Sequence, residues 1–147
     1  GMLQGALEAY VELNKNRQGR ADGKKVAEDP YNLEICARAT LAMREVRALL
    51  RNDWNELMEK AEAGARIEVQ DRVAYRANAG AATDRMVKAL DDLFMASGGS
   101  AIFLNQDIQR FFQDIHGARA HHANNPIKTQ RNYGGLLMGE QTTDFFL

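Results

Sequence analysis

The chain carries only two prolines, Pro30 and Pro126, and between them apolar residues recur with helical spacing over long stretches. Because this spacing is helical rather than alternating, we expect an all-α protein. A first helix is indicated by apolar residues that step by three and four: Leu3, Ala6, Leu7, Tyr10 and Leu13. It gives way to a polar, glycine-containing loop, residues 14–29.

A second, longer helix is predicted to begin at Asp29-Pro30, where Asp29 can cap it and Pro30 suits its first turn. Gly64 is placed to end it. Its inward stripe alternates steps of four and three, which is typical of nearly parallel helix packing. The stripe consists of Cys36, Thr40, Met43, Arg47, Leu50, Trp54, Leu57 and Ala61. We therefore expect Trp54 to lie in the core.

Two more helices complete the pattern. The third is closed by Gly98-Gly99, and the fourth stops at Asn124-Asn125-Pro126. Their inward residues are Val73, Ala77, Gly80, Val87, Leu90 and Phe94, then Ile108, Phe111, Phe112, Ile115 and Ala118. Phe94, Phe103, Phe111 and Phe112 are expected to pack in the core. Short joints predict an up-and-down four-helix bundle over residues 2–126, with small residues around Gly80 allowing close approach of a neighbour.

The tail, residues 127–147, carries the apolar patches Leu136-Leu137-Met138 and Phe145-Phe146-Leu147. Apolar chain ends rarely remain in water, so we expect the tail to dock on the bundle or on a neighbouring subunit. The same patches predict self-association into dimers or tetramers.

Composition narrows the class of protein. Nineteen Lys and Arg against 20 Asp and Glu give a net charge of -1 over 147 residues, which favours neither nucleic acid nor an anionic membrane as partner. The single Cys36 allows no internal disulfide, and no apolar run reaches the ~18 residues of a membrane span. We expect a cytoplasmic protein.

Familiar catalytic patterns are missing from the sequence. A Gly-rich phosphate loop, a serine nucleophile elbow, paired cysteines and His-Glu-x-x-His are absent, which disfavours dinucleotide folds, hydrolases and zinc sites. His116, His121 and His122 cluster, but on one helix they would point about 100° to 140° apart, so we predict no metal site. His122 falls on the core stripe, where a buried structural role and a functional role both fit. His121 lies on the flank, where it could line a pocket.

Other polar residues interrupt the apolar faces. Arg47, Thr83 and Asp84 could form an ion pair between facing helices or could face a pocket. The turn Ser97-Gly98-Gly99 could simply end a helix, or it could offer a backbone surface that a ligand approaches closely.

Three segments of the chain resemble a known family: residues 93–101 (LFMASGGSA), 109–121 (QRFFQDIHGARAH) and 124–126 (NNP). They are similar to the C-terminal helical domain of flavin-dependent monooxygenases built on the acyl-CoA dehydrogenase fold. Looser similarity at residues 5–10 and 51–54 extends this likeness over nearly the whole chain.

The resemblance implies a two-component enzyme, usually a tetramer, that hydroxylates aromatic or heterocyclic substrates with O2 and reduced FMN or FAD supplied by a reductase. It assigns a catalytic histidine to His121, with His122 as the neighbour that could take this role instead. Ser97, Gly98 and Gly99 are the candidate flavin contacts. The dehydrogenase cousins often carry a catalytic carboxylate where this chain has His122, which favours a hydroxylase over an acyl-CoA dehydrogenase.

Two departures from the family qualify that implication. Gln113 stands where the family usually has arginine, which removes an expected salt bridge. The N-terminal helical domain and the middle β-domain, which form most of the flavin site, are absent from the sequence, so the chain alone should be inactive and hold no flavin tightly. The uncapped start of the first helix favours a truncated enzyme. A fragment of an acyl-CoA dehydrogenase and a non-catalytic helical oligomerisation module remain the alternatives.

Overall fold

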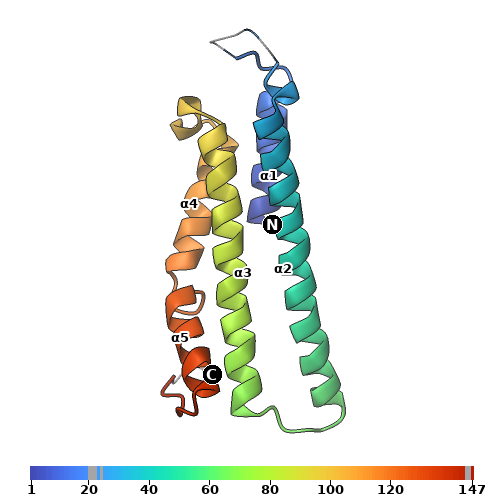
Figure 1. Ribbon diagram of the computed structural model, residues 1–147, viewed down its shortest axis with the longest axis vertical. Helices are drawn as coiled ribbons and strands as arrows, with labels where there is room; N and C mark the ends of the chain where they lie inside the picture. The colour runs from blue at the N-terminus through green and yellow to red at the C-terminus, as the bar shows by residue number, and fades with distance from the viewer. Residues whose placement is uncertain (20–22, 24, 145–146) are drawn as a thin grey trace. The chain divides into compact units, whose positions relative to one another are not determined.

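The computed structural model describes residues 1–19, 23, 25–144 and 147. Over these residues the chain forms five α-helices, two short 3-10 helices and no strand (Figure 1). The helices are α1 (Met2–Asn14), α2 (Pro30–Glu62), α3 (Val69–Ala96), α4 (Asp107–Ala120) and α5 (Pro126–Leu137), with η1 (Val26–Glu28) and η2 (Gly99–Ile102) between them. The expected all-α class is confirmed, and the structure adds α5 within the segment predicted as a tail.

The chain folds as two compact units. The first unit comprises Gly1–Arg44 and Arg85–Gly117, and the second comprises Glu45–Asp84 and Ala118–Leu147. The predicted division into a bundle of residues 2–126 and a docking tail stays a prediction. Phe145 and Phe146, part of the predicted apolar terminus, lie outside the described residues.

Local capping signals place the ends of the long helices as predicted. Asp29 Oδ1 accepts hydrogen bonds from the backbone N–H groups of Tyr31 and Asn32, at 2.9 and 3.2 Å. Gly64 follows the end of α2 with φ of 64°, and Gly98 follows α3 with φ of 73°. Both glycines occupy the left-handed region, where a side chain would be strained, so the chain turns where the sequence permits it.

The first unit has a core of large side chains. α1 lies alongside the first part of α2 (Figure 1), and the buried residues of the unit come from α1, α2, α3, η2 and α4. They are Leu3, Ala6, Tyr10, Ile35, Ala39, Ala42, Val87, Ala89, Leu90, Leu93, Ala101, Ile108 and Ile115. Tyr10 donates its hydroxyl to Asn32 Oδ1, and burial raises the pKa of Tyr10 to about 12.

The second unit is built from smaller side chains. Its buried hydrophobic residues are Val46, Val73, Ala77 and Ala82, joined by the buried polar residues Thr83 and Thr129. Polar pairs link its helices: Asn78 Nδ2 donates to Asp53 Oδ1 at 3.0 Å, and Lys60 Nζ lies 2.8 Å from Asp71 Oδ2.

The predicted stripe of α2 is wrong by one residue. Ile35, Ala39, Ala42 and Val46 are buried, whereas Thr40 and Arg47 are exposed and the Trp54 side chain is 61% exposed. The alternating period was correct, but one residue corresponds to a rotation of 100° about the helix axis. The buried stripe contains small alanines, which give a weak apolar signal in the sequence. The larger apolar residues next to it therefore predicted the wrong face of the helix.

The predicted core position of Phe103 is also wrong. Phe103 follows η2, in the connection to α4, and its side chain is 59% exposed. The other three phenylalanines, Phe94, Phe111 and Phe112, are partly buried and pack against the core of the first unit. A residue in a connection has no neighbouring turn of helix to cover it, which explains the difference.

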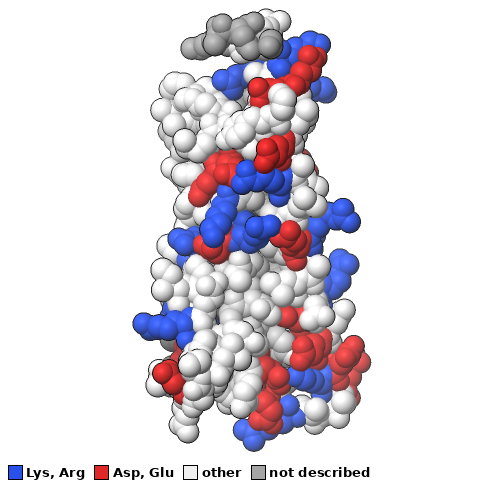
Figure 2. Space-filling view, viewed as in Figure 1, with Lys and Arg blue, Asp and Glu red and all other residues white. Residues whose placement is uncertain are grey.

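Charged side chains of both signs are interspersed on the face shown in Figure 2. This distribution agrees with the net charge of -1 and shows no large area of one sign on that face. Within the part of the chain that the structure describes, no helix is both long and apolar enough to cross a membrane.

Candidate functional site

The two predicted histidines lie in a turn between α4 and α5, which we call the double-histidine turn (residues 121–125). α4 ends at Ala120, and both His121 and His122 are exposed. The expected place of His122 on a buried helical stripe is therefore wrong, because the helix ends before it. The imidazole rings of His121 and His122 lie against each other, with centroids 4.4 Å apart.

The backbone defines how His121 can act. The backbone N–H of Ala123 donates to His121 Nδ1 at 3.3 Å. A ring nitrogen that accepts a hydrogen bond carries no proton, so the neutral ring in this geometry holds its proton on Nε2. His121 therefore has an Nε2–H group that can donate to a substrate or oxygen atom.

Asparagines support the double-histidine turn from both ends. Asn124 Nδ2 donates to the carbonyl of Ala118 at 3.1 Å, which gives a hydrogen-bond partner to a carbonyl group in the last turn of α4. Asn125 Oδ1 accepts from the N–H groups of Ile127 and Lys128, at 3.0 and 3.3 Å, and so caps α5. A side-chain cap at the next helix and a side-chain bond to the previous one hold the turn in a defined conformation.

A glycine on α3 allows α5 to approach. A Cβ atom added at Gly80 would lie 2.3 Å from Thr129 Oγ1 and 3.2 Å from Pro126 Cα. Arg119, one turn before the histidines, pairs with Asp84 on α3 through Nε at 3.0 Å and Nη2 at 2.9 Å. The close approach expected at Gly80 is confirmed, and Asp84 forms the interhelical ion pair that the sequence left open. Thr83, by contrast, donates to the carbonyl of Ala79 within its own helix, at 3.0 Å.

The second predicted contact, Ser97-Gly98-Gly99, lies in the first unit at the end of α3. Ser97 is fully buried, and its hydroxyl donates to the carbonyl of Leu93 at 2.8 Å. Gly98 and Gly99 are exposed, and nothing lies within 4 Å of a Cβ added at Gly99. The glycine backbone is thus open to a ligand, whereas the serine side chain serves the turn itself.

Arg17, which sequence reasoning did not single out, holds this glycine turn. Its Nη1 donates to the carbonyl of Ser97 at 2.8 Å and to Asn14 Oδ1 at 3.4 Å. A cation here also complements the negative end of the α3 dipole. Arg17 belongs to an irregular polar loop, so no periodicity pointed to it.

His116 forms a dyad with Asp91 that was likewise not predicted. His116 Nε2 lies 2.8 Å from Asp91 Oδ1, and the His116 ring packs on Phe112 with centroids 4.5 Å apart. Phe112 in turn stacks on Phe94 at 4.1 Å. His116 thus has a partner within the first unit. Among the described residues no group of three or more His, Cys, Asp or Glu side chains could hold a metal ion.

The family model of the acyl-CoA dehydrogenase C-terminal domain matches residues 1–126. The chain therefore belongs to this family, and the predicted resemblance is confirmed. Helices α1 to α4, the glycine turn after α3 and the double-histidine turn after α4 fall within the matched residues, whereas α5 begins at the last of them.

Curated relatives place the chain more narrowly, beside flavin-dependent monooxygenases. The oxygenase subunit HsaA of a flavin-dependent monooxygenase from Mycobacterium tuberculosis is 35% identical over 141 residues, covering 95% of this chain and 36% of that protein. The chain thus spans little more than a third of the length of that relative. It is related to the C-terminal part of such enzymes.

Solved structures agree with this relation. The 3-HSA hydroxylase from Rhodococcus sp. RHA1 superposes with a TM-score of 0.85 at 30% identity, over 97% of this chain and 37% of that one. XiaF from Streptomyces, solved in complex with FADH2 and glycerol, superposes with a TM-score of 0.89 over 99% of this chain and 37% of its own. At 19% identity, XiaF supports the fold alone.

Proposed function

We propose that this chain forms the C-terminal helical part of a flavin-dependent monooxygenase that hydroxylates an aromatic or heterocyclic substrate with reduced flavin and O2. The observation that carries the proposal is its 35% identity to HsaA over 95% of the chain. N-terminal and middle domains would complete the flavin site, and a reductase would supply reduced FMN or FAD. Localisation in the cytoplasm follows from the need for a reductase and reduced flavin.

His121 is the residue we assign to proton transfer. When bound, reduced flavin supplies the electrons that activate O2. His121 offers an Nε2–H donor on an exposed turn, while its Nδ1 is held by the backbone of Ala123. Histidine is the side chain best suited to exchange a proton at neutral pH, so this donor can hold or pass a proton at a reacting oxygen. His122, whose ring centroid lies 4.4 Å from that of His121, is the alternative residue for this role.

The glycine turn is the part of this chain that we assign to flavin contact. The exposed backbone at Gly99 can approach a planar ring closely, because nothing lies within 4 Å of a Cβ added there, and at Gly98 the neighbouring side chain is that of Arg17, whose Nη2 lies 3.3 Å from an added Cβ. Ser97 and Arg17 would position that backbone from behind, since the Ser97 hydroxyl and carbonyl are already hydrogen-bonded. A short turn cannot enclose a flavin, so the isolated chain should bind reduced flavin weakly.

The experiment that tests the proposal is a chimera in which this chain replaces the matching C-terminal part of an HsaA enzyme. With reductase and the HsaA substrate, we expect hydroxylation above that of the truncated enzyme. His121→Asn should slow it at least ~100-fold, the lower range for loss of a general acid or base. His116→Asn is the matched control, because His116 already has Asp91 as partner and lies outside the double-histidine turn.

Several outcomes would contradict the assignment. Full activity of both His121→Asn and His122→Asn would leave the turn without a catalytic role. Oxidation of an acyl thioester, in place of hydroxylation, would favour the acyl-CoA dehydrogenase alternative. A folded chimera with neither activity would favour a non-catalytic helical module.

We also propose that the chain associates with itself, as a dimer or tetramer, or with the missing domains, through apolar side chains left exposed. On α2 these are Leu50, Trp54 and Met58, spaced by four residues and 38% to 61% exposed. Leu137 and Met138 at the end of α5 are 70% and 85% exposed. Exposed apolar residues at helical spacing form a face that a partner helix can cover. A monomer in sedimentation at micromolar concentration would contradict self-association.

A further inference from the structure

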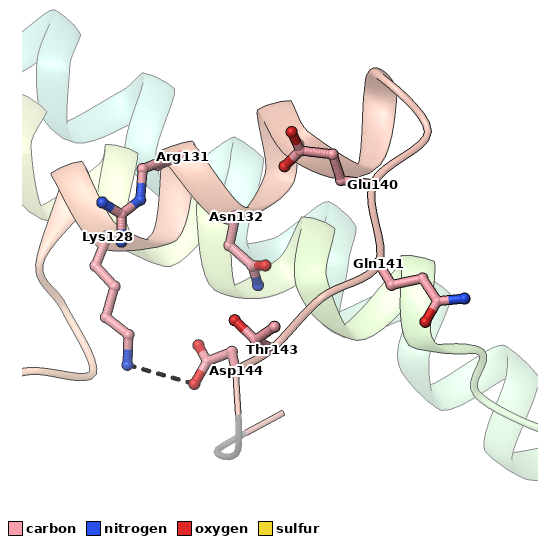
Figure 3. Close-up of a pocket in the computed structure, with 8 residues that line it drawn as sticks. Lys128, Arg131, Asn132, Glu140, Gln141, Thr143 and Asp144 are labelled. Atoms are coloured by element: carbon pink, nitrogen blue, oxygen red, sulfur yellow. Dashed lines mark hydrogen bonds and ion pairs between the residues drawn. The ribbon is translucent and has the colours of Figure 1, made fainter.

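The end of the chain folds back over α5 as a segment that we call the C-terminal strap (residues 139–144). After α5 ends at Leu137, Gly139 adopts φ of 87°, and the N–H of Glu140 donates to the carbonyl of Gly135 at 2.9 Å. This left-handed glycine reverses the chain. The strap then runs antiparallel to α5, with Asp144 reaching Lys128 near the start of that helix (Figure 3).

Two contacts set the register of the strap. Thr142 Oγ1 donates to Asn132 Oδ1 at 2.8 Å, and the N–H of Asp144 donates to Thr142 Oγ1 at 3.1 Å. Two residues further along, Lys128 Nζ lies 3.3 Å from Asp144 Oδ1. A step of two residues in the extended strap therefore spans about one turn of the helix.

Asp144 is buried between two cations. Only 4% of its side chain is exposed, and Arg76 Nε on α3 lies 3.8 Å from Asp144 Oδ2, opposite Lys128. Arg76 Nε and Nη2 are buried and make no hydrogen bond among the described residues. A buried guanidinium needs an acceptor, and the Asp144 carboxylate is the anion within reach. Removal of that carboxylate would leave Arg76 and Lys128 facing each other.

The strap also walls a polar groove of about 410 Å³. Its lining comes from α5 and the strap, and includes Arg131, Asn132, Gln141 and Thr143 (Figure 3). Figure 3 shows Asn132 projecting from α5 toward the strap, so this side chain joins the two walls. The groove exists only while the strap is docked.

We propose that the C-terminal strap is a charge-locked closure: Asp144, clamped between Arg76 and Lys128, holds the end of each chain on its own α3 and α5 and forms the polar groove beneath it. The strap is then docked within one chain rather than exchanged with a neighbour. The inference does not depend on the monooxygenase assignment, because it uses only contacts within the second unit.

Hydrogen exchange of the intact chain, followed by mass spectrometry, tests the closure. In Asp144→Asn we expect the amides of residues 139–144 to exchange at least about tenfold faster, because a neutral amide cannot compensate the buried guanidinium atoms of Arg76 and the neighbouring Lys128 ammonium. Glu140→Gln is the matched control: it removes a carboxylate from the same strap, but from an exposed side chain. It should exchange at the unaltered rate.

Amides of α5 serve as the internal reference. If Asp144→Asn also exposes α5, then Thr142→Val decides, because it removes the hydroxyl contacts to Asn132 and to the N–H of Asp144 while the Asp144 carboxylate stays in place. Strap exchange in Thr142→Val as fast as in Asp144→Asn, or equal effects of Asp144→Asn and Glu140→Gln, would overturn the proposal. Protection that disappears on dilution would overturn docking within one chain, since exchange with a neighbour depends on concentration.

Discussion

The two compact units differ in how their interiors are made. The first unit buries large side chains, such as Leu3, Tyr10 and Leu90, in one continuous cluster. The second buries mainly alanine, valine and threonine, and links its helices with charge pairs such as Arg119–Asp84 and Lys60–Asp71. Apolar burial yields stability that depends little on pH or salt, whereas charge pairs depend on both. The double-histidine turn and the C-terminal strap both lie in the second unit, whose helices these charge pairs link.

The largest effect should come from the core of the first unit. Leu90 is fully buried. Leu90→Ala should lower the free energy of unfolding by about 3 to 5 kcal/mol, because it removes buried methyl groups and leaves a cavity. Urea denaturation followed by circular dichroism measures this loss. A cost below about 1 kcal/mol would show that the first unit does not depend on its large side chains.

Trp54→Ala is the control in the second unit. A buried tryptophan would cost about 3 to 5 kcal/mol, the value expected from the stripe read off the sequence. With 61% of the side chain exposed, we now expect less than about 1 kcal/mol for the monomer. Weaker self-association in sedimentation, without a change in monomer stability, would identify Trp54 as part of a partner surface.

The second expected effect tests close packing within the second unit. Gly80→Ala places a methyl group against Thr129 Oγ1 and the backbone at Pro126, and we expect a loss of about 1 to 3 kcal/mol from overpacking. Gly134→Ala on α5 is the matched control, because nothing lies within 4 Å of its added Cβ. That change should stabilise by up to about 1 kcal/mol through helix propensity. Equal stabilisation by both substitutions would contradict tight contact between α3 and α5.

The smallest expected effect is a loss of stability at acidic pH. The hydrogen bond from Lys60 holds the pKa of Asp71 below its ordinary value, and the same lysine lowers the pKa of Glu56. A carboxyl group whose pKa is lower in the folded state stabilises above its unfolded pKa, near pH 4, and loses this contribution as pH falls through the folded value. Burial raises the pKa of Asp71 and the hydrogen bond from Lys60 lowers it, and the hydrogen bond has the larger effect.

Thermal unfolding at two pH values measures this contribution. Asp71→Asn should melt below the unaltered chain at pH 7, and the difference should shrink as the pH falls below the unfolded pKa, about 4, through the lower folded pKa, where the carboxyl becomes protonated in both states. The pKa of Lys60 is raised, so its contribution is lost only at alkaline pH and does not affect this range. Asp107→Asn, an exposed carboxyl of the first unit, is the control and should show no such convergence.

Features set by a few neighbouring residues were predictable from the sequence. Asp29 and Pro30 begin α2, and Gly64 and Gly98 end α2 and α3, because a cap or a left-handed backbone is a local requirement. The four-and-three spacing of α2 was likewise correct. The family could be assigned from residues 93–126, whose motifs are local in the chain.

The site could be predicted only in part. The sequence singled out His121 and His122, but their exposure follows from the end of α4 at Ala120, which no strong stop signal marked. Arg17, and the pairing of His116 with Asp91, depend on residues 80 and 25 positions away in the chain. Contacts across such distances leave no periodic signal.

What the sequence by itself determined is the helical class, the main helix ends and the family, because each depends on local spacing, capping or motif. The tertiary structure alone decided which face of α2 is buried, since alanines at positions 39 and 42 compete with larger apolar neighbours and a partner's shape selects between them. It also decided that α5 packs closely on α3 at Gly80, and that Asp144 is buried. A charge is buried only where opposite charges from elsewhere in the chain surround it, and that requires the fold.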